Sequence, residues 1–244
     1  DAGGKVTAFR SYTGGLVAPK YDNNPWNYKF TWNPRNVVVA GQGSAAQVIV
    51  NRKYKFIPYH QLFRRTFRTD VLDYGEFEGY MNRDSLKYRG LYGLEEVPTM
   101  IRGTLRRPGF SKTWNIFVQL GCTDDTYTLE HSEDMTYREF INTFLKYDPV
   151  LSVEEKIQKY FNLEEDSGIM YRLRWLGIFK DIKIGLKNAT PAQILQKMLE
   201  DKWKLDEDDK DMIVMQHKFE YELNEQKKRI TSSLVVEGTD TVHT

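Results

Sequence analysis

Three helix start signals, close together in the second half of the chain, constrain the fold most. Each is a capping box, in which a hydroxyl side chain and a carboxylate or amide three positions later satisfy free backbone N–H groups. The pairs are Thr136 with Glu139, Ser152 with Glu155, and Thr190 with Gln193. Pro191 adds the residue favoured at the first helical position. Apolar residues recur at helical spacing after the first and third signals, so the pattern predicts packed α-helices from about Met135 onward.

Strand-like segments lie on both sides of this helical region. Before it, three segments are rich in β-branched or aromatic residues and are separated by glycine or Asn-Pro breaks: Lys5 to Tyr12, Asn27 to Trp32 and Gln47 to Ile57. After the acidic linker 206–211, residues 212–223 and 229–237 have the pattern of a long antiparallel hairpin around the polar turn 224–228.

The order of sheet, helices and sheet predicts one interrupted domain. Neither sheet portion alone has enough strands to bury a face, so we expect an α+β domain with a helical insertion rather than two tandem domains. The expected boundaries are 1–133 and 212–244 for the sheet domain and 134–211 for the helical subdomain.

Composition excludes several classes of protein. Apolar residues make up 40% of the 244 residues and charged residues 28%, as expected of a globular protein with a packed core. No apolar run approaches the roughly 18 to 20 residues of a membrane span, and no signal-peptide pattern is present, so we expect a cytoplasmic protein. Cys122 is the only cysteine and the four histidines are scattered, which argues against a metal site. The chain starts at Asp1, as a piece of a longer protein would.

The charge distribution favours small anions as partners. Residues 1–129 carry 18 Lys or Arg against 11 Asp or Glu, although the whole chain has a net charge of only +1. These cations are scattered among apolar segments without a dense basic tract or a nucleic-acid-binding motif. We therefore expect no nucleic-acid partner.

A glycine motif that resembles a dinucleotide fingerprint does not satisfy its requirements. Gly41, Gly43 and Ala46 match G-x-G-x-x-A after an apolar run, but residues 48–53 form a poor helix. No acidic residue for the ribose hydroxyls occurs from Asn23 through Thr69, although an arginine could replace it for a phosphorylated ribose. A helix or turn that ends at the glycines is the favoured interpretation.

The segment 80–109 carries the most informative pattern of charges. If residues 102–106 form a strand, its period of two places Arg102, Thr104 and Arg106 on one face and Leu105 on the other. Guanidinium groups bind carboxylates through two parallel hydrogen bonds and a threonine hydroxyl can donate to the same oxygens. Together with Arg83, this strand could hold a ligand with several carboxylates. The alternative is that two of these arginines serve salt bridges or face solvent.

Two further segments have both a binding and a structural interpretation. Thr13, Gly14 and Gly15 follow a strand-like run, and glycines there allow main-chain N–H groups to approach a ligand closely. A tight turn is the structural alternative. The aromatic residues of 28–32 could form a wall for a planar ligand, but such residues more often belong to a core.

Taken together, these segments resemble the saccharopine dehydrogenase (L-glutamate-forming) family, also called saccharopine reductase. The resemblance spans almost the whole chain and rests on five ordered motifs besides Gly4-Lys5-Val6. They are Gly14-Gly15-Leu16-x-Ala18-Pro19, Asn23-Asn24-Pro25-x-x-Tyr28-Lys29-Phe30-Thr31-Trp32, Asn82-Arg83-Asp84-Ser85, Ile101-Arg102-Gly103-Thr104-Leu105-Arg106, and Lys210-Asp211-Met212-Ile213-Val214-Met215. One departure is Thr13, where family members have cysteine.

The resemblance implies an architecture in which this chain is half of an enzyme. In the family a Rossmann domain of the same chain precedes this region and holds NADP or NAD. The present chain would be the substrate-binding and dimerisation domain, with a mixed, largely antiparallel sheet covered by helices, as in the second domains of related dehydrogenases. We therefore expect a homodimer and no turnover by this chain alone.

The resemblance also assigns roles to particular residues. The substrate saccharopine would contact Arg83, Thr104, Leu105 and Arg106, and Arg102 shares their strand. Thr13 and Gly14 would line the mouth of the site, while Trp32 and Asn33 would close on the cofactor side. The proton-transfer residues of the family have no counterpart here, so no catalytic residue is expected in this chain.

The implied reaction is the oxidation of saccharopine with NAD(P)⁺ and water to L-glutamate and 2-aminoadipate 6-semialdehyde, a step of lysine metabolism. A related reductive condensation of polyamine synthesis, of the carboxynorspermidine or homospermidine type, is an alternative, although its substrates have fewer carboxylates. A non-catalytic ligand-binding domain with the same fold is another.

Overall fold

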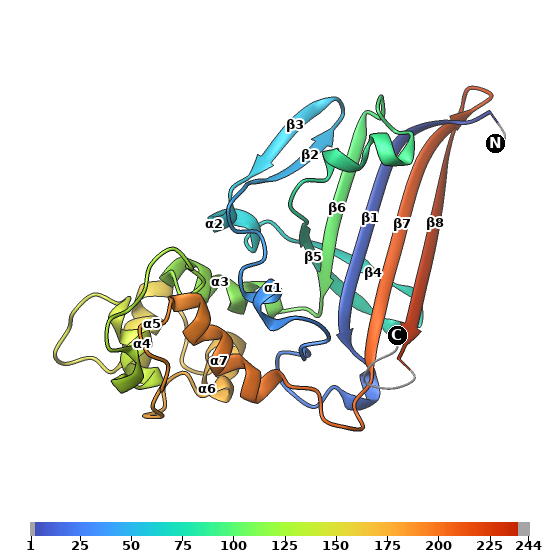
Figure 1. Ribbon diagram of the computed structural model, residues 1–244. Coiled ribbons are helices and arrows are strands. Elements are labelled where there is room, and N and C mark those ends of the chain that lie inside the picture. Colours follow the sequence, from blue (N-terminus) through green and yellow to red (C-terminus); the bar gives the residue numbers. More distant parts are fainter. Residues whose placement is uncertain (1–2, 239–244) are drawn as a thin grey trace. The chain divides into compact units, whose positions relative to one another are not determined.

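The computed structural model describes residues 3–238, which form two compact units (Figure 1). The sheet unit comprises residues 3–21, 41–111 and 207–238, and the helical unit comprises residues 22–40 and 112–206. Both units are therefore assembled from separated stretches of chain. The helical subdomain expected at 134–211 remains a prediction. The compact helical unit also contains residues 22–40 and 112–133 and ends at residue 206.

An eight-stranded sheet forms the first unit. Its strands are β1 (Lys5–Val17), β2 (Ala46–Val50), β3 (Lys53–Ile57), β4 (Phe67–Asp70), β5 (Glu76–Met81), β6 (Thr99–Arg106), β7 (Asp211–Leu223) and β8 (Gln226–Glu237). The order is β3-β2-β6-β1-β7-β8, and β5 pairs with both β4 and β6. Among the pairs of strands β1 to β8, only β1–β6 is parallel. The expected α+β class with a mixed, largely antiparallel sheet is confirmed.

Strand β6 is the branch point of the sheet. Its first half meets β2 through the pair Met100 and Ile49, and its second half pairs with β5 from Gly103 to Arg106. Along its other edge it runs parallel to β1 (Figure 1). The strand that carries the arginines is thus an interior strand, supported on both edges.

The two hairpins differ in how well the sequence predicted them. Strands β7 and β8 form the expected long hairpin, but with a two-residue turn at Asn224 and Glu225, both at positive φ, rather than the turn 224–228. Residues 47–57 were expected as one strand. They form the hairpin β2–β3 instead, because Asn51 and Arg52 adopt the left-handed conformation of a tight two-residue turn.

The helices of the chain are short. The α-helices are α1 (Pro34–Val38), α2 (Tyr59–Leu62), α3 (Phe110–Leu120), α4 (Tyr137–Thr143), α5 (Val153–Phe161), α6 (Gly168–Leu176) and α7 (Pro191–Trp203). The 3₁₀ turns are η1 (Pro19–Tyr21), η2 (Leu72–Tyr74), η3 (Leu86–Tyr88), η4 (Gly90–Tyr92) and η5 (Ser132–Asp134). No helix within residues 3–238 has both the length and the apolar character that a bilayer crossing requires.

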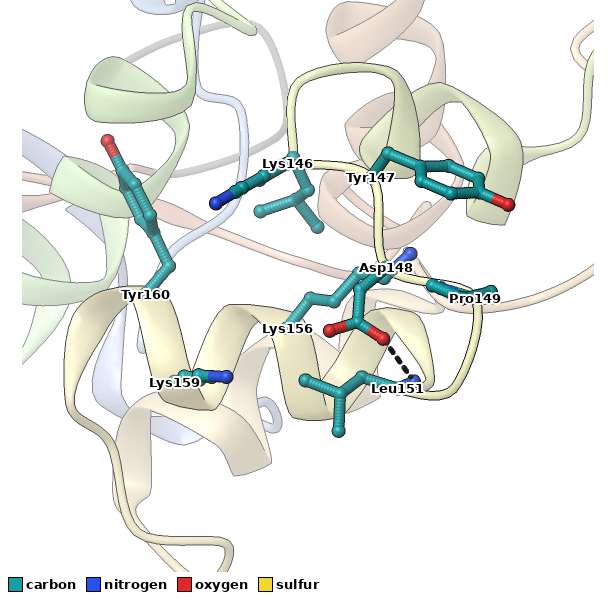
Figure 2. A pocket seen from close by; sticks show the side chains of 9 residues that line it. Lys146, Tyr147, Asp148, Pro149, Leu151, Lys156, Lys159 and Tyr160 are labelled. Atoms are coloured by element: carbon teal, nitrogen blue, oxygen red, sulfur yellow. Dashed lines mark hydrogen bonds between the residues drawn. The ribbon is translucent and has the colours of Figure 1, made fainter.

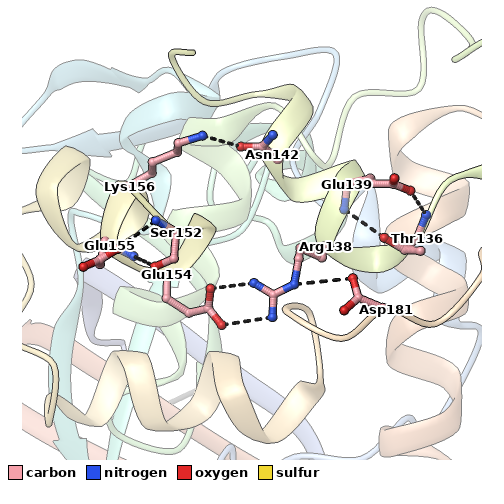
Figure 3. A network of polar contacts seen from close by, with 9 residues as sticks. All are labelled: Thr136, Arg138, Glu139, Asn142, Ser152, Glu154, Glu155, Lys156 and Asp181. Atoms are coloured by element: carbon pink, nitrogen blue, oxygen red, sulfur yellow. Dashed lines mark hydrogen bonds and ion pairs between the residues drawn. The ribbon is translucent and has the colours of Figure 1, made fainter. Parts of the chain in front are cut away.

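All three expected capping boxes are confirmed at the starts of α4, α5 and α7. At α4 the Glu139 carboxylate accepts the Thr136 N–H at 2.7 Å, and the Thr136 hydroxyl accepts the Glu139 N–H at 3.2 Å (Figure 3). An ion pair then joins α4 to α5. Arg138 donates to both carboxylate oxygens of Glu154, at 2.8 and 3.3 Å, and approaches Asp181 at 3.5 Å (Figure 3).

Aromatic side chains form the core of the helical unit around Trp203. Trp26, Tyr28, Phe30 and Trp114 lie within 6.0 Å of its ring, centroid to centroid. The expected strand at 27–32 is wrong for this reason: these residues lie in an irregular segment whose side chains fill the helical core. The Phe30 N–H donates to the Trp203 carbonyl in place of a ladder partner.

One face of β1 and β6 is covered within the sheet unit. Phe9 of β1 and Met100 of β6 pack with Ile49, Leu86 and Val97 in a buried apolar cluster. Tyr88, Leu94 and Phe219 border it. The polar residues discussed below continue this same face along the strands.

Candidate site on two parallel strands

The paired strands β1 and β6 present a polar strip. Directly paired residues share a face, and the register sets Ser11 opposite Arg102 and Thr13 opposite Thr104. Because side chains alternate along a strand, Arg106 belongs to this face as well, as the sequence predicted. The arginine positions span about 13 Å along the strand at roughly 3.3 Å per residue. We call Ser11, Thr13, Arg102, Thr104 and Arg106 the polar strip.

Arg102 is held against an aromatic ring. Its guanidinium carbon lies 3.9 Å from the centroid of the Tyr88 ring, at the end of η3. A guanidinium that contacts a ring through its face can still donate its in-plane N–H groups to a planar carboxylate. The backbone N–H of Arg102 donates to the Ser85 hydroxyl at 2.9 Å, which fixes the strand beside the Asn82–Ser85 motif.

Arg106 is nearly buried, with only 5% of its surface exposed. Its Nη1 donates to the Leu105 carbonyl at 2.9 Å, and its guanidinium lies 5.4 Å from the Phe110 ring centroid. Leu105 itself projects from the opposite face and is fully buried. A ligand in contact with Leu105 would therefore meet its main chain, because its side chain belongs to the core.

Arg83 lies in a loop whose main chain is held by hydrogen bonds to neighbouring strands. The Gln47 N–H donates to the Arg83 carbonyl and the Asn82 N–H donates to the Arg102 carbonyl, both at 2.8 Å. Asp84 accepts the Leu86 N–H at 2.8 Å and so starts η3. The Arg83 side chain is exposed, with no hydrogen bond or ion pair to residues 3–238. The loop thus fixes the main chain of Arg83 while its guanidinium remains available.

Thr13 and Gly14 lie inside β1, so the tight-turn interpretation of this segment is wrong. Thr13 is exposed beside Thr104, whereas Gly14 is buried against β6. A Cβ atom on Gly14 would lie 2.6 Å from the Leu105 carbonyl oxygen, closer than any ordinary contact. Glycine is therefore required here by the close approach of the two strands.

The expected cofactor-side residues belong to the helical unit. Trp32 exposes 60% of its surface, and Asn33 caps α1 by accepting the Arg35 N–H at 3.0 Å. The glycine motif ends α1 in a turn and leads into β2, which confirms that no helix opens there to receive a pyrophosphate. The described residues thus lack the element that binds dinucleotide phosphates in a Rossmann fold.

One cluster of possible metal ligands occurs outside the polar strip. Donor atoms of His131, Glu133 and Asp134 lie within 4.8 Å of one another around η5. His131 and Asp134 are exposed, and Lys183 donates to the Asp134 carbonyl. Exposed groups with a cation already beside them are common at protein surfaces, and we assign no metal to them.

No role was predicted from the sequence for three residues that contribute to the strip, although Ser85 is part of the Asn82–Ser85 motif. Tyr88 stacks on Arg102, Ser85 anchors its main chain, and Tyr80 lies opposite Thr104 in the β5–β6 register. Tyr80 follows from strand alternation once β5 and β6 are known to pair. The contact of Tyr88 has no local signal, because it depends on the path of the chain between β5 and β6.

Comparisons with known proteins define the family. The sequence model of the saccharopine dehydrogenase C-terminal domain matches residues 1–244, and the chain belongs to this family. A saccharopine dehydrogenase [NADP(+), L-glutamate-forming] of Schizosaccharomyces pombe is 32% identical over 236 residues, which cover 93% of this chain and 52% of that protein. A mitochondrial alpha-aminoadipic semialdehyde synthase of Rattus norvegicus is 30% identical over 90% of this chain and 24% of that protein.

A solved structure shows the same architecture. The apo saccharopine dehydrogenase (L-Glu forming) of Saccharomyces cerevisiae superposes with a TM-score of 0.83 at 30% identity, over 98% of this chain and 55% of that chain. The chain thus spans about half the length of the two-domain relatives that it matches.

Proposed function

We propose that this chain is the substrate-binding half of an oxidoreductase that converts saccharopine, NAD(P)⁺ and water into L-glutamate, 2-aminoadipate 6-semialdehyde, NAD(P)H and a proton. The observation that carries the proposal is the polar strip in a member of this family: two arginines and two threonines on one face of paired strands, beside Arg83.

The strip suits a ligand with several carboxylates. Arg102 and Arg106 lie on one strand but four residues apart, so they can bind carboxylates at separate positions rather than one carboxylate together. Thr13 and Thr104 supply hydroxyl donors between them. Saccharopine carries three carboxylates and one secondary ammonium, and holding it in one orientation shortens the path for hydride transfer.

A nicotinamide dinucleotide supplies the hydride acceptor in this reaction. The absence of a pyrophosphate-binding turn in residues 3–238 supports a division of labour in which another domain of the same chain binds most of that cofactor. Trp32 and Asn33 are proposed to lie on the cofactor side of the site. The choice between NADP and NAD and the proton-transfer residues belong to that other domain.

The substrate assignment is tested with the complete protein. We expect turnover of saccharopine with NAD(P)⁺ to exceed turnover of carboxynorspermidine. Faster turnover of carboxynorspermidine would replace the assignment by the polyamine alternative. Measurable ligand binding without turnover of either compound would favour a non-catalytic domain.

Arg83 offers the clearest test of the site itself. Because its side chain is exposed and forms no hydrogen bond or ion pair with residues 3–238, Arg83→Ala should leave stability nearly unchanged. Loss of one charge-assisted contact should raise the KM for saccharopine by about tenfold to a hundredfold. Arg83→Lys should raise the KM less, because the lysine keeps the positive charge. Arg65→Ala is the matched control, since Arg65 is also exposed and lies in the same unit. Unchanged kinetics of Arg83→Ala would remove this residue from the site.

We further propose that the protein is a cytoplasmic homodimer. The β7–β8 hairpin supports a dimer, because Ile230, Leu234 and Val236 share one face of β8 and expose 52%, 51% and 39% of their surface. Such a row of apolar side chains on a strand at the sheet edge favours association. Leu234→Glu should shift the sedimentation of the complete protein to that of a monomer. A wild-type protein that sediments as a monomer at micromolar concentration would contradict the dimer.

A further inference from the structure

A pocket of about 530 Å³ lies on the helical unit between the α4–α5 loop and α5 (Figure 2). The loop contributes Lys146, Tyr147 and Asp148, while α5 contributes Lys156, Lys159 and Tyr160. The α5 residues are three and four positions apart, so they share one face of the helix. Leu145, Pro149 and Leu151 complete the lining with apolar surface.

The pocket is built on a fixed loop. The Asp148 carboxylate accepts the Leu151 N–H at 3.0 Å (Figure 2). It also accepts the Val150 N–H at 2.9 Å and so closes a turn before α5 begins. Ser152 then starts α5 through its capping box. Both walls of the pocket are therefore held by backbone hydrogen bonds, which lowers the entropy lost when a ligand binds.

The charges in the pocket are mainly positive. Lys146 and Lys159 form no ion pair with residues 3–238, and Lys156 donates to the neutral amide of Asn142 at 3.0 Å. Asp148 is the single acidic lining residue; its carboxylate accepts loop N–H groups and is also attracted to Lys156 and Lys159, so two of the three positive charges remain in excess. Glu155 lies one turn before Lys159, but it accepts the Ser152 N–H at 2.7 Å and does not line the pocket.

We propose that this pocket is a binding site for a small phosphorylated molecule. Its three cations are all ammonium groups, which bind phosphate as point charges, whereas none of the lining residues is an arginine with the planar fork that matches carboxylates. The volume lies within the roughly 300 to 1,000 Å³ of small-molecule sites. Tyr147 and Tyr160, exposed by 84% and 65%, offer ring faces and hydroxyl groups to the rest of such a ligand.

This site is independent of the polar strip and of the proposed reaction. It differs from the strip in its chemistry, with lysines and tyrosines in place of arginines and threonines. Its residues also belong to the other compact unit. The experiment therefore measures binding at the lysines and requires no turnover.

Lysine footprinting of the complete protein tests the location. The protein is saturated with its nicotinamide dinucleotide, so that the cofactor site is filled, and is then acetylated with and without pyrophosphate. Mass spectrometry should show several-fold slower acetylation of Lys146 and Lys159 with pyrophosphate. Lys180, which is exposed in the same unit and does not line the pocket, should be acetylated at an unchanged rate. Equal acetylation of Lys146 and Lys159 in both samples would overturn the proposal.

Titration calorimetry tests the chemistry. Lys146→Gln with Lys159→Gln should weaken pyrophosphate binding by about tenfold or more, while Lys180→Gln should leave it unchanged. Citrate should bind the wild-type protein at least about tenfold more weakly than pyrophosphate. Equal affinities for citrate and pyrophosphate, or equal losses in the double variant and the Lys180 control, would also overturn the proposal.

Discussion

Replacing Gly14 by alanine tests how tightly β1 and β6 are packed beneath the polar strip. The added Cβ atom would lie 2.6 Å from the Leu105 carbonyl oxygen and 3.1 Å from the Leu105 Cβ, whereas ordinary contacts begin at 3.4 Å. The first of these partners is a backbone atom in an interior strand, so it cannot rotate away. One of the two strands must move by several tenths of an ångström.

The expected loss of stability follows from two opposing effects. Overpacking of this kind costs about 1–3 kcal/mol. Removing a glycine from the unfolded chain returns about 0.4–1 kcal/mol. We therefore expect Gly14→Ala to lower the free energy of unfolding by about 1–2 kcal/mol, or roughly 2–8 °C in Tm for a chain of this size.

Gly90→Ala is the matched control, because the same methyl group meets only the Glu95 carboxylate there, at an ordinary 3.8 Å, and the backbone is not left-handed. It should be neutral or slightly stabilising. Urea unfolding gives the two free energies, and hydrogen exchange should show faster opening of β1 and β6 in Gly14→Ala. If Gly14→Ala were as stable as Gly90→Ala, the close approach of these strands would be refuted.

Three further predictions concern the helical unit. The pKa values of Glu139 and Glu155 lie below their ordinary range because their carboxylates accept the Thr136 and Ser152 backbone N–H groups. The stability that these two ionised carboxylates add is therefore present above pH 4.5 and declines as the pH falls below it. Acid unfolding followed by circular dichroism should show this, and Glu139→Gln with Glu155→Gln should weaken the dependence; an identical acid transition in the variant would contradict it. A double-mutant cycle with Arg138→Met and Glu154→Gln should give a coupling free energy of unfolding of about 0.5–1 kcal/mol, because both side chains are partly solvated. Zero coupling would mean that the ion pair adds nothing to stability. Cys122 is fully buried and burial raises its pKa, so a thiol reagent should modify it only on unfolding; rapid labelling of the native protein would show that the segment opens.

Local chemistry made part of the fold predictable. The three capping boxes located α4, α5 and α7, since each depends only on residues three positions apart. The structure confirms the strand that was only assumed for 102–106, as part of β6. The failures involve partners that are distant in sequence. Residues 27–32 have a strand-like composition, but their aromatic side chains pack around Trp203, more than 170 positions later.

The candidate site was also predictable only where it depends on residues close together in the sequence. Strand periodicity placed Arg102, Thr104 and Arg106 on one face. Periodicity does not reveal that Thr13 lies beside Thr104, because that pairing depends on a parallel connection of some 90 residues. It also treats the arginines alike, whereas Arg106 is nearly buried, Arg102 stacks on Tyr88 and Arg83 is exposed. Those differences come from packing, and they decide which substitution tests binding without disturbing the fold.

The long sequence separation between β1 and its partner strands has a consequence for synthesis of the protein. Both partners of β1 come much later, β6 from Thr99 and β7 from Asp211. At about 5–20 residues per second, a ribosome needs roughly 10–40 s to extend the chain from Val17 to Asp211. Through that interval one or both edges of β1, which carries the apolar residues Phe9, Leu16 and Val17, remain without their native partners. A nascent chain in this state is a natural client for a chaperone that shields extended apolar segments until β7 emerges.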